Sequence, residues 1–145
     1  MIGPTPFDRL IVLEVGREAV AIRNIPGTLA IFDSHFPRFP VLPGVVLIDS
    51  MARLAALALG GSNWTLSGAE VVRFRHFVRP GDEARIAVTV LDGPGPVGLA
   101  GTCGATVTVD GRTVATARRL HLVRMPVPEP NPAPESAPAA EGVPA

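Results

Sequence analysis

The stretch from Gly44 to Leu59 has no internal glycine or proline and is apolar on nearly every face of the helix that it predicts. A helix that is apolar all round is stable only when other structure surrounds it. Asp49 and Arg53 argue against a membrane span, because each charge at mid-bilayer costs about 2.5 to 3.5 kcal/mol. The stretch therefore predicts a buried helix, which Gly60 and Gly61 end.

Runs on both sides of this helix alternate between apolar and polar residues, as strands do. Before the helix, Leu10 to Val15 and Ala19 to Ile25 predict a β-hairpin. After it, Asp110 and Gly111 form a favoured hairpin turn, and Pro80-Gly81-Asp82 marks another turn. The apolar faces comprise Ala84, Ile86, Val88 and Val90 in one run, and Val97, Leu99, Gly101, Cys103, Ala105, Val107 and Val109 in the next.

These elements predict an α+β fold in one order: a hairpin, a proline-rich loop, one long helix, then about four antiparallel strands. A curved antiparallel sheet wrapped around the helix satisfies that order. Because one sheet cannot enclose a helix completely, we expect a partner subunit to cover the remaining side. Small residues in the fifth strand region would let the sheet approach the helix closely: Gly98, Ala100, Gly101, Gly104 and Ala105.

Length and composition are those of one small domain, with 145 residues of which 47% are hydrophobic. We expect the domain over residues 1–124 and a disordered tail rich in proline and alanine over 125–145. Thirteen basic residues balance thirteen acidic ones, which gives no reason to expect nucleic acid or a membrane as partner. The single cysteine, Cys103, and the absence of a signal-peptide pattern predict a cytoplasmic protein in which Cys103 is a small core residue.

The segment from His35 to Asp49 combines three groups that suit one kind of chemistry. A neutral histidine, with an ordinary pKa of about 6.5, accepts a proton at physiological pH, so His35 is a candidate base. A carboxyl group among apolar neighbours stays protonated more readily, so Asp49 is a candidate acid. The backbone N–H groups of Gly44 and Val45, at the positive end of the helix, are candidates to stabilise a carbonyl oxygen that becomes negative. Elimination of water beside a thioester carbonyl requires all three.

This segment resembles the 3-hydroxyacyl-[acyl-carrier-protein] dehydratases of the FabA/FabZ type, which have the hot-dog fold. The shared pattern is His-Phe-Pro, a short spacer, Pro-Gly-Val and a carboxylate on the helix, and the resemblance extends from about Ile11 to Val123. It implies that His35 removes the α-proton and that Asp49 protonates the departing hydroxyl, from different subunits of a dimer. It also implies an acyl carrier protein as partner and a reaction without metal or redox cofactor. The side chains expected to line the acyl tunnel are Phe32, Phe36, Phe39 and Pro43.

Two positions depart from the family pattern. Arg38 stands where the family usually has glycine, which alters the loop if that position needs a positive φ angle. Arg53 stands where the family usually has glutamine, one helical turn beyond Asp49, so an ion pair would hold Asp49 ionised. The family also has Glu more often than Asp at position 49; Asp is found in a branch that can also isomerise the double bond.

Two other functions remain open at this point. One is a non-catalytic or half-site partner subunit of a heteromeric dehydratase, which Arg38 and Arg53 support. The other is an acyl thioesterase of the same fold, which needs a carboxylate but has no evident use for His35. Arg73, Arg75 and Arg79 form either a solvated face or a contact for the acidic carrier protein and the phosphate of its pantetheine arm.

Overall fold

The computed structural model describes residues 7–26, 42–61, 63–94 and 98–124. The chain begins with two antiparallel strands, β1 (Arg9–Glu14) and β2 (Glu18–Asn24). Their turn contains Gly16, whose N–H donates to the carbonyl of Ala58 at the end of the helix. The hairpin predicted from the sequence is therefore confirmed, and its turn is anchored to the helix.

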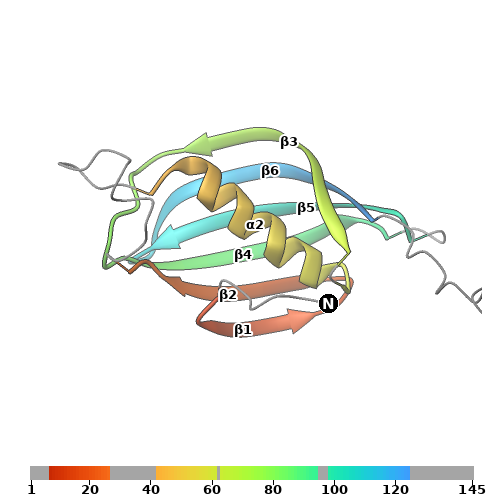
Figure 1. Ribbon diagram of the computed structural model, residues 1–145, viewed down its shortest axis with the longest axis horizontal. Helices are drawn as coiled ribbons and strands as arrows, with labels where there is room; N and C mark the ends of the chain where they lie inside the picture. Colours follow the sequence, from red (N-terminus) through yellow and green to blue (C-terminus); the bar gives the residue numbers. More distant parts are fainter. Residues whose placement is uncertain (1–6, 27–41, 62, 95–97, 125–145) are drawn as a thin grey trace, which may run out of the picture.

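The central helix, α2 (Gly44–Ala58), lies across the concave side of the sheet (Figure 1). It ends as predicted, with Gly60 in the left-handed region at φ +99°. Its sheet-facing residues are buried, among them Leu47, Met51 and Leu54. The single chain leaves the opposite side of the helix uncovered, where Val45 is 70% exposed, in line with the expectation that one sheet cannot enclose the helix completely.

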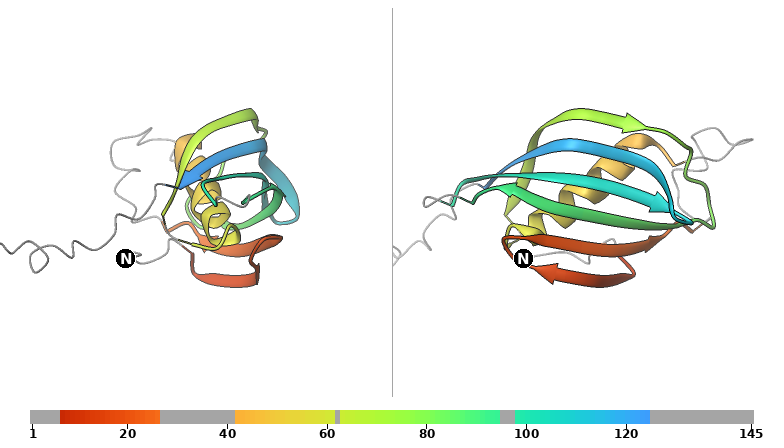
Figure 2. Two further views of the ribbon diagram at one scale, coloured as in Figure 1. Left: turned by 90° about the vertical axis from the view of Figure 1, so that its right-hand side faces the viewer. Right: turned by 180° about the vertical axis from the view of Figure 1, so that it is seen from behind.

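Four antiparallel strands follow the helix, in agreement with the sequence pattern. In the six-stranded sheet the order is β1-β2-β4-β5-β6-β3, so β1 and β3 are the edges. The sheet curls around the helix in the end-on view of Figure 2. Asp110 and Gly111 both have positive φ, which is the geometry of the two-residue hairpin turn predicted there. The bounds are β3 (Trp64–Phe74), β4 (Glu83–Asp92), β5 (Ala100–Val109) and β6 (Arg112–Arg124).

The close approach between β5 and the helix depends on Gly101. A Cβ atom at that position would lie 2.7 Å from the Leu59 side chain, so no larger residue fits without a shift. Ala105 is also buried, as expected. The prediction is wrong for Ala100 and Gly104, because strand alternation sends even-numbered positions to the other side of the sheet, and for Gly98, which precedes β5 and faces the Arg124 side chain.

Two alternating runs predicted as apolar faces bury most of their members. Ala84, Ile86 and Val88 are at most 1% exposed. Leu99 differs: β5 begins one residue later, and Leu99 is 38% exposed while its carbonyl accepts the N–H of Arg124. Val97 lies outside the described residues.

Apolar side chains are also exposed at both edges of the sheet. On β1 these are Leu10, Ile11 and Leu13, and on β3 they are Val71 and Phe74. Within the described residues, no helix is long and apolar enough to cross a membrane. The end of β3 adjoins the start of the helix, where the Phe74 ring contacts Gly44.

Candidate active site

The start of α2 presents two backbone N–H groups that have no hydrogen-bond partner among the described residues. Pro43 precedes the helix without capping it through a side chain. The carbonyl of Pro43 accepts the N–H of Val46 at 3.0 Å, and this leaves the N–H groups of Gly44 and Val45. Leu42, just before, donates to the carbonyl of Val78 at 2.7 Å, which ties the helix start to the β3–β4 connection. Among the described residues, these two N–H groups at the positive end of the helix are available to an acceptor, and their role as an oxyanion site stays a prediction.

Phe74, at the end of β3, packs directly on Gly44. A Cβ atom built on Gly44 would lie 2.7 Å from the ring Cζ of Phe74, so glycine permits this contact. The ring is at the edge of the sheet, and Phe74 is 49% exposed. The helix start thus has an aromatic wall that the sequence did not predict, although Phe74 stands in a segment that resembles the family.

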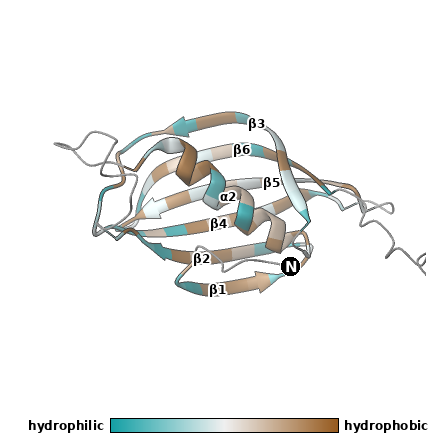
Figure 3. Cartoon of the chain, in the orientation of Figure 1, coloured by the Kyte–Doolittle hydropathy of each residue, from teal (hydrophilic) through white to brown (hydrophobic). Residues whose placement is uncertain are grey.

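Asp49 lies on the open side of the helix with Arg53. Arg53 Nε donates to Asp49 Oδ2 at 3.0 Å, and both side chains are 57% exposed. The predicted ion pair is present. The expectation that apolar side chains surround Asp49 is wrong for the single chain, because the apolar neighbours Leu47 and Met51 point to the sheet and Asp49 points away from it. In Figure 3 the strongly hydrophilic part of the helix is its middle.

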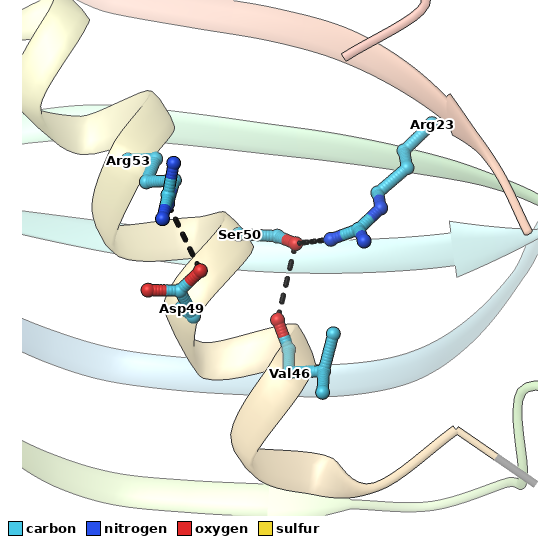
Figure 4. Close-up of polar contacts among 5 residues, drawn as sticks. All are labelled: Arg23, Val46, Asp49, Ser50 and Arg53. Carbon is cyan, nitrogen blue, oxygen red and sulfur yellow. Dashed lines mark hydrogen bonds and ion pairs between the residues drawn. The ribbon is translucent and has the colours of Figure 1, made fainter. Parts of the chain in front are cut away.

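Ser50, the residue after Asp49, is the only polar residue that is buried among those described. Its hydroxyl donates to the carbonyl of Val46 at 3.1 Å and accepts a hydrogen bond from Arg23 Nη1 at 2.5 Å. Arg23 reaches the helix from β2, and Figure 4 shows this contact on a different side of the helix from the Asp49–Arg53 pair. This contact was not predicted from the sequence, in which the available signal was a lone serine in an otherwise apolar helix.

A cleft of about 490 Å³ lies between the β3–β4 connection and the β5–β6 turn, next to Phe74. Arg75, Arg79 and Arg112 line it, with Asp82 and Asp110. The cleft thus brings together Arg75 and Arg79, two of the three arginines expected to contact a carrier protein. It does not include Arg73, and it adds Arg112, which the sequence analysis missed because the two segments are far apart in the chain.

Several predicted site residues fall outside the described residues: His35, Arg38 and the tunnel residues Phe32, Phe36 and Phe39. Cys103 is fully buried, and burial raises the pKa of its thiol to about 11, which fits a core residue. No cluster of His, Cys, Asp or Glu that could hold a metal ion occurs in the described part of the chain.

A second polar network lies across β3, β6 and β5. His121 contacts the Glu70 carboxylate through Nε2, and its Nδ1 lies 3.3 Å from the Thr102 hydroxyl. The Ser67 hydroxyl donates to the His121 carbonyl at 3.1 Å. These residues lie on the side of the sheet away from the helix, so this network is separate from Asp49.

One long helix held in a curved, six-stranded antiparallel sheet is the arrangement of the hot-dog class of α+β proteins. Solved structures agree. The dehydratase heterocomplex ApeI:P from Xenorhabdus doucetiae matches with a TM-score of 0.70 at 15% identity, over 83% of both chains. An uncharacterised protein from Pyrococcus horikoshii matches with a TM-score of 0.66 at 14% identity, over 86% of this chain and 95% of that one.

Sequence comparisons narrow the class to a family. The ApeI-like family model, described as ApeI dehydratase, matches residues 14–102. The 3-hydroxyacyl-[acyl-carrier-protein] dehydratase FabZ of Geobacillus sp. (strain WCH70) is 34% identical over 113 residues, which cover 74% of this chain and 76% of that protein. The FabZ of Ligilactobacillus salivarius (strain UCC118) is 36% identical over 123 residues, covering 81% and 86%. The chain belongs to this family of FabZ-like hot-dog dehydratases.

Proposed function

We propose that this protein is a dehydratase that converts 3-hydroxyacyl thioesters on an acyl carrier protein to trans-2-enoyl thioesters. The observation that carries the proposal is the position of Asp49 in a chain of this family. Asp49 lies in the second turn of α2, on its open side, one turn after the N–H groups of Gly44 and Val45, which have no partner among the described residues. A carboxyl group and an N-terminal oxyanion site on one helix suit an elimination next to a carbonyl.

In the proposed mechanism His35 takes the proton from the α-carbon of the acyl chain. The electron pair of that C–H bond forms the new double bond as the C–O bond at the β-carbon breaks. Asp49 gives its proton to the departing hydroxyl, which leaves as water. The N–H groups of Gly44 and Val45 stabilise the negative charge that develops on the thioester oxygen, where preorganised donors contribute most. Phe32, Phe36, Phe39 and Pro43 line the acyl chain in this proposal.

Asp49 must be protonated to act as the acid, whereas Arg53 favours its carboxylate. An exposed pair of this type contributes only about 0.3 to 0.5 kcal/mol. We propose that a second subunit covers Asp49 and supplies His35. The exposed Val45 and the apolar, unpaired β3 edge beside it support such a contact.

The second subunit is either a second copy or a related chain. A related chain would make this protein the half-site partner of a heteromeric dehydratase, as the Asp49–Arg53 pair suggests. We favour a homodimer, because this one chain carries both His35 and Asp49. We further propose a cytoplasmic location, a folded domain over residues 1–124 and a tail over 125–145.

The carrier protein is proposed to dock at the cleft lined by Arg75, Arg79 and Arg112. Arginine suits the phosphate of a pantetheine arm, because its planar guanidinium binds two phosphate oxygens at once. Phe74 lines this cleft and also contacts Gly44, so an arm that enters here would reach the oxyanion site.

The proposal is tested by incubating the purified protein with a 3-hydroxyacyl carrier protein and following the loss of water by mass spectrometry. We expect dehydration by the wild type and none by His35→Ala or Asp49→Ala. Dehydration that survives both substitutions refutes the residue assignment. Release of the free acid supports a thioesterase, and activity only after a second homologue is added supports the half-site subunit.

A further inference from the structure

The contact between Arg23 and Ser50 is the one directional interaction that the described structure places between a sheet side chain and the buried side of α2. The other sheet-facing residues of the helix are apolar, and apolar burial is not directional. Such contacts hold the helix on the sheet through packing. Backbone hydrogen bonds fasten its two ends, from Leu42 to Val78 before the start and from Gly16 to Ala58 at the end, so the Arg23–Ser50 contact is the side-chain link at the second turn. The partly buried hydrogen bond from Arg23 to Ser50, at 2.5 Å, depends by contrast on both distance and angle.

The Ser50 hydroxyl both donates and accepts a hydrogen bond. It uses its proton on the carbonyl of Val46 and an oxygen lone pair on Arg23 Nη1. Arg23 lies near the end of β2, where it is paired with Ala84 of the neighbouring strand β4. The second turn of the helix is therefore fastened to a strand that is itself held between two others.

Asp49 depends on this turn for its direction. Successive helical residues are about 100° apart, so the rotation that seats Ser50 against β2 also aims Asp49 at the open side (Figure 4). Among the described residues, the Asp49 carboxylate is paired with Arg53, an exposed side chain of the same helix that rotates with it. The Asp49–Arg53 pair thus cannot orient Asp49 relative to the rest of the protein.

A small rotation of the helix would matter for catalysis. Side-chain ends lie about 5 to 6 Å from a helix axis, so a rotation of about 10° moves a carboxylate by about 1 Å. A misplacement of about 1 Å costs about 100-fold in rate when the group must meet its reacting atom at hydrogen-bond distance.

We propose that Arg23 and Ser50 are positioning residues for Asp49. Arg23 bonds the Ser50 hydroxyl from β2, and this bond sets the rotation of α2 that presents the Asp49 carboxyl to the substrate. The inference rests on the proposed function, since it assigns a role relative to Asp49 as the acid.

The test measures kcat, KM and the melting temperature of the full chain with a 3-hydroxyacyl carrier protein. Arg23→Met is expected to lower kcat by about 10- to 100-fold, with KM within about 2-fold of the wild type. Arg23→Lys, which keeps a charged donor, is expected to retain kcat within about 3-fold. Ser50→Ala removes only the hydroxyl, and alanine favours a helix, so this variant should fold. Its kcat is expected to fall by about 5- to 10-fold.

The matched control is Arg85→Met, an exposed arginine on β4, which is expected to leave kcat unchanged. The double variant of Arg23→Met and Ser50→Ala should lose no more than Arg23→Met alone, because both substitutions remove one contact. If Arg23→Met destabilises the protein, the kcat values of Ser50→Ala and Arg23→Lys still test the positioning role.

Values of kcat within 2-fold of the wild type for both Arg23→Met and Ser50→Ala would overturn the inference, as would a change confined to KM. His35→Ala and Asp49→Ala, run in the same assay, separate the two proposals. If they abolish dehydration while Arg23→Met and Ser50→Ala do not lower kcat, the positioning role alone is wrong. If dehydration survives them, the assignment of Asp49 is wrong and the positioning role with it.

Discussion

At the residue scale, His121 links three strands on the side of the sheet that faces away from the helix. Its Nε2 contacts the Glu70 carboxylate, and its Nδ1 lies within hydrogen-bond distance of the Thr102 hydroxyl. The hydrogen bond from His121, together with the charges of His121, Arg119 and Arg118, holds the pKa of Glu70 below its ordinary value of 4.5. This network stabilises the attachment of the edge strand β3.

The Glu70–His121 contact predicts a pH-dependent stability difference. A carboxyl group whose pKa is lowered by folding stabilises the folded state above its unfolded pKa, and this contribution is lost as the pH falls through the folded value. Glu70→Gln should therefore lower the melting temperature at pH 7, and the difference from the wild type should shrink below about pH 4. Thermal unfolding at both pH values checks this. Glu83→Gln, an exposed change on β4, is the control, and a gap that persists at low pH would contradict the interpretation.

At the scale of elements, the start of α2 and the end of β3 meet through Gly44 and Phe74. The sequence around Gly44 or Phe74 does not predict this contact, because the two residues come together only when β3 lies along the edge of the sheet. The contact joins the predicted oxyanion site to the basic cleft, since Phe74 also lines the cleft. The backbone bond from Leu42 to Val78 holds the same two elements together.

This contact predicts a compensating pair of substitutions. Gly44→Ala places a methyl group 2.7 Å from the Phe74 ring, and because the ring is half-exposed it can move, so we expect a loss of about 1 kcal/mol of folding free energy. In the background of Phe74→Ala the same change should cost almost nothing. Chemical denaturation of the four proteins gives the coupling energy. Gly68→Ala, where an added Cβ meets nothing within 4 Å, is the control; equal losses in both backgrounds would exclude the clash.

At the scale of the whole molecule, a single chain leaves its functional side open. Asp49, Val45 and the β3 edge are all exposed there, although the domain has a continuous core between α2 and the sheet. A single chain therefore has its own hydrophobic core, whereas the proposed site still needs a second subunit to cover it. A site completed by a second subunit explains why an apolar helix tolerates exposed positions such as Val45.

A homodimer with shared sites predicts that two inactive variants restore each other. His35→Ala and Asp49→Ala chains are each inactive alone in this proposal. After unfolding and refolding together at equal amounts, half of the dimers are hybrids with one intact site of two, so about a quarter of the wild-type activity should return. Each variant refolded alone is the control. No recovery in a mixture that forms hybrid dimers would mean that one chain supplies both groups.

Most of the architecture was predictable from the sequence, because it depends on local periodicity. The hairpin before the helix, the limits of α2 and the Asp110-Gly111 turn follow from alternation, from apolar runs and from glycine, and each was confirmed. Family membership was predictable too, since it rests on a contiguous motif. The surroundings of Asp49 were not, because the apolar residues of its helix face the sheet.

The sequence by itself determined the order of the elements, the core-facing positions and the carboxylate on the helix, since these arise from contacts between near neighbours in the chain. Only the tertiary structure decided that Asp49 faces outward with Arg53, that Arg23 binds Ser50 and that Phe74 covers Gly44. Each of the last two joins residues from different strands and the helix, and their distance depends on how the sheet curves and where the helix rests on it. No local pattern encodes that geometry.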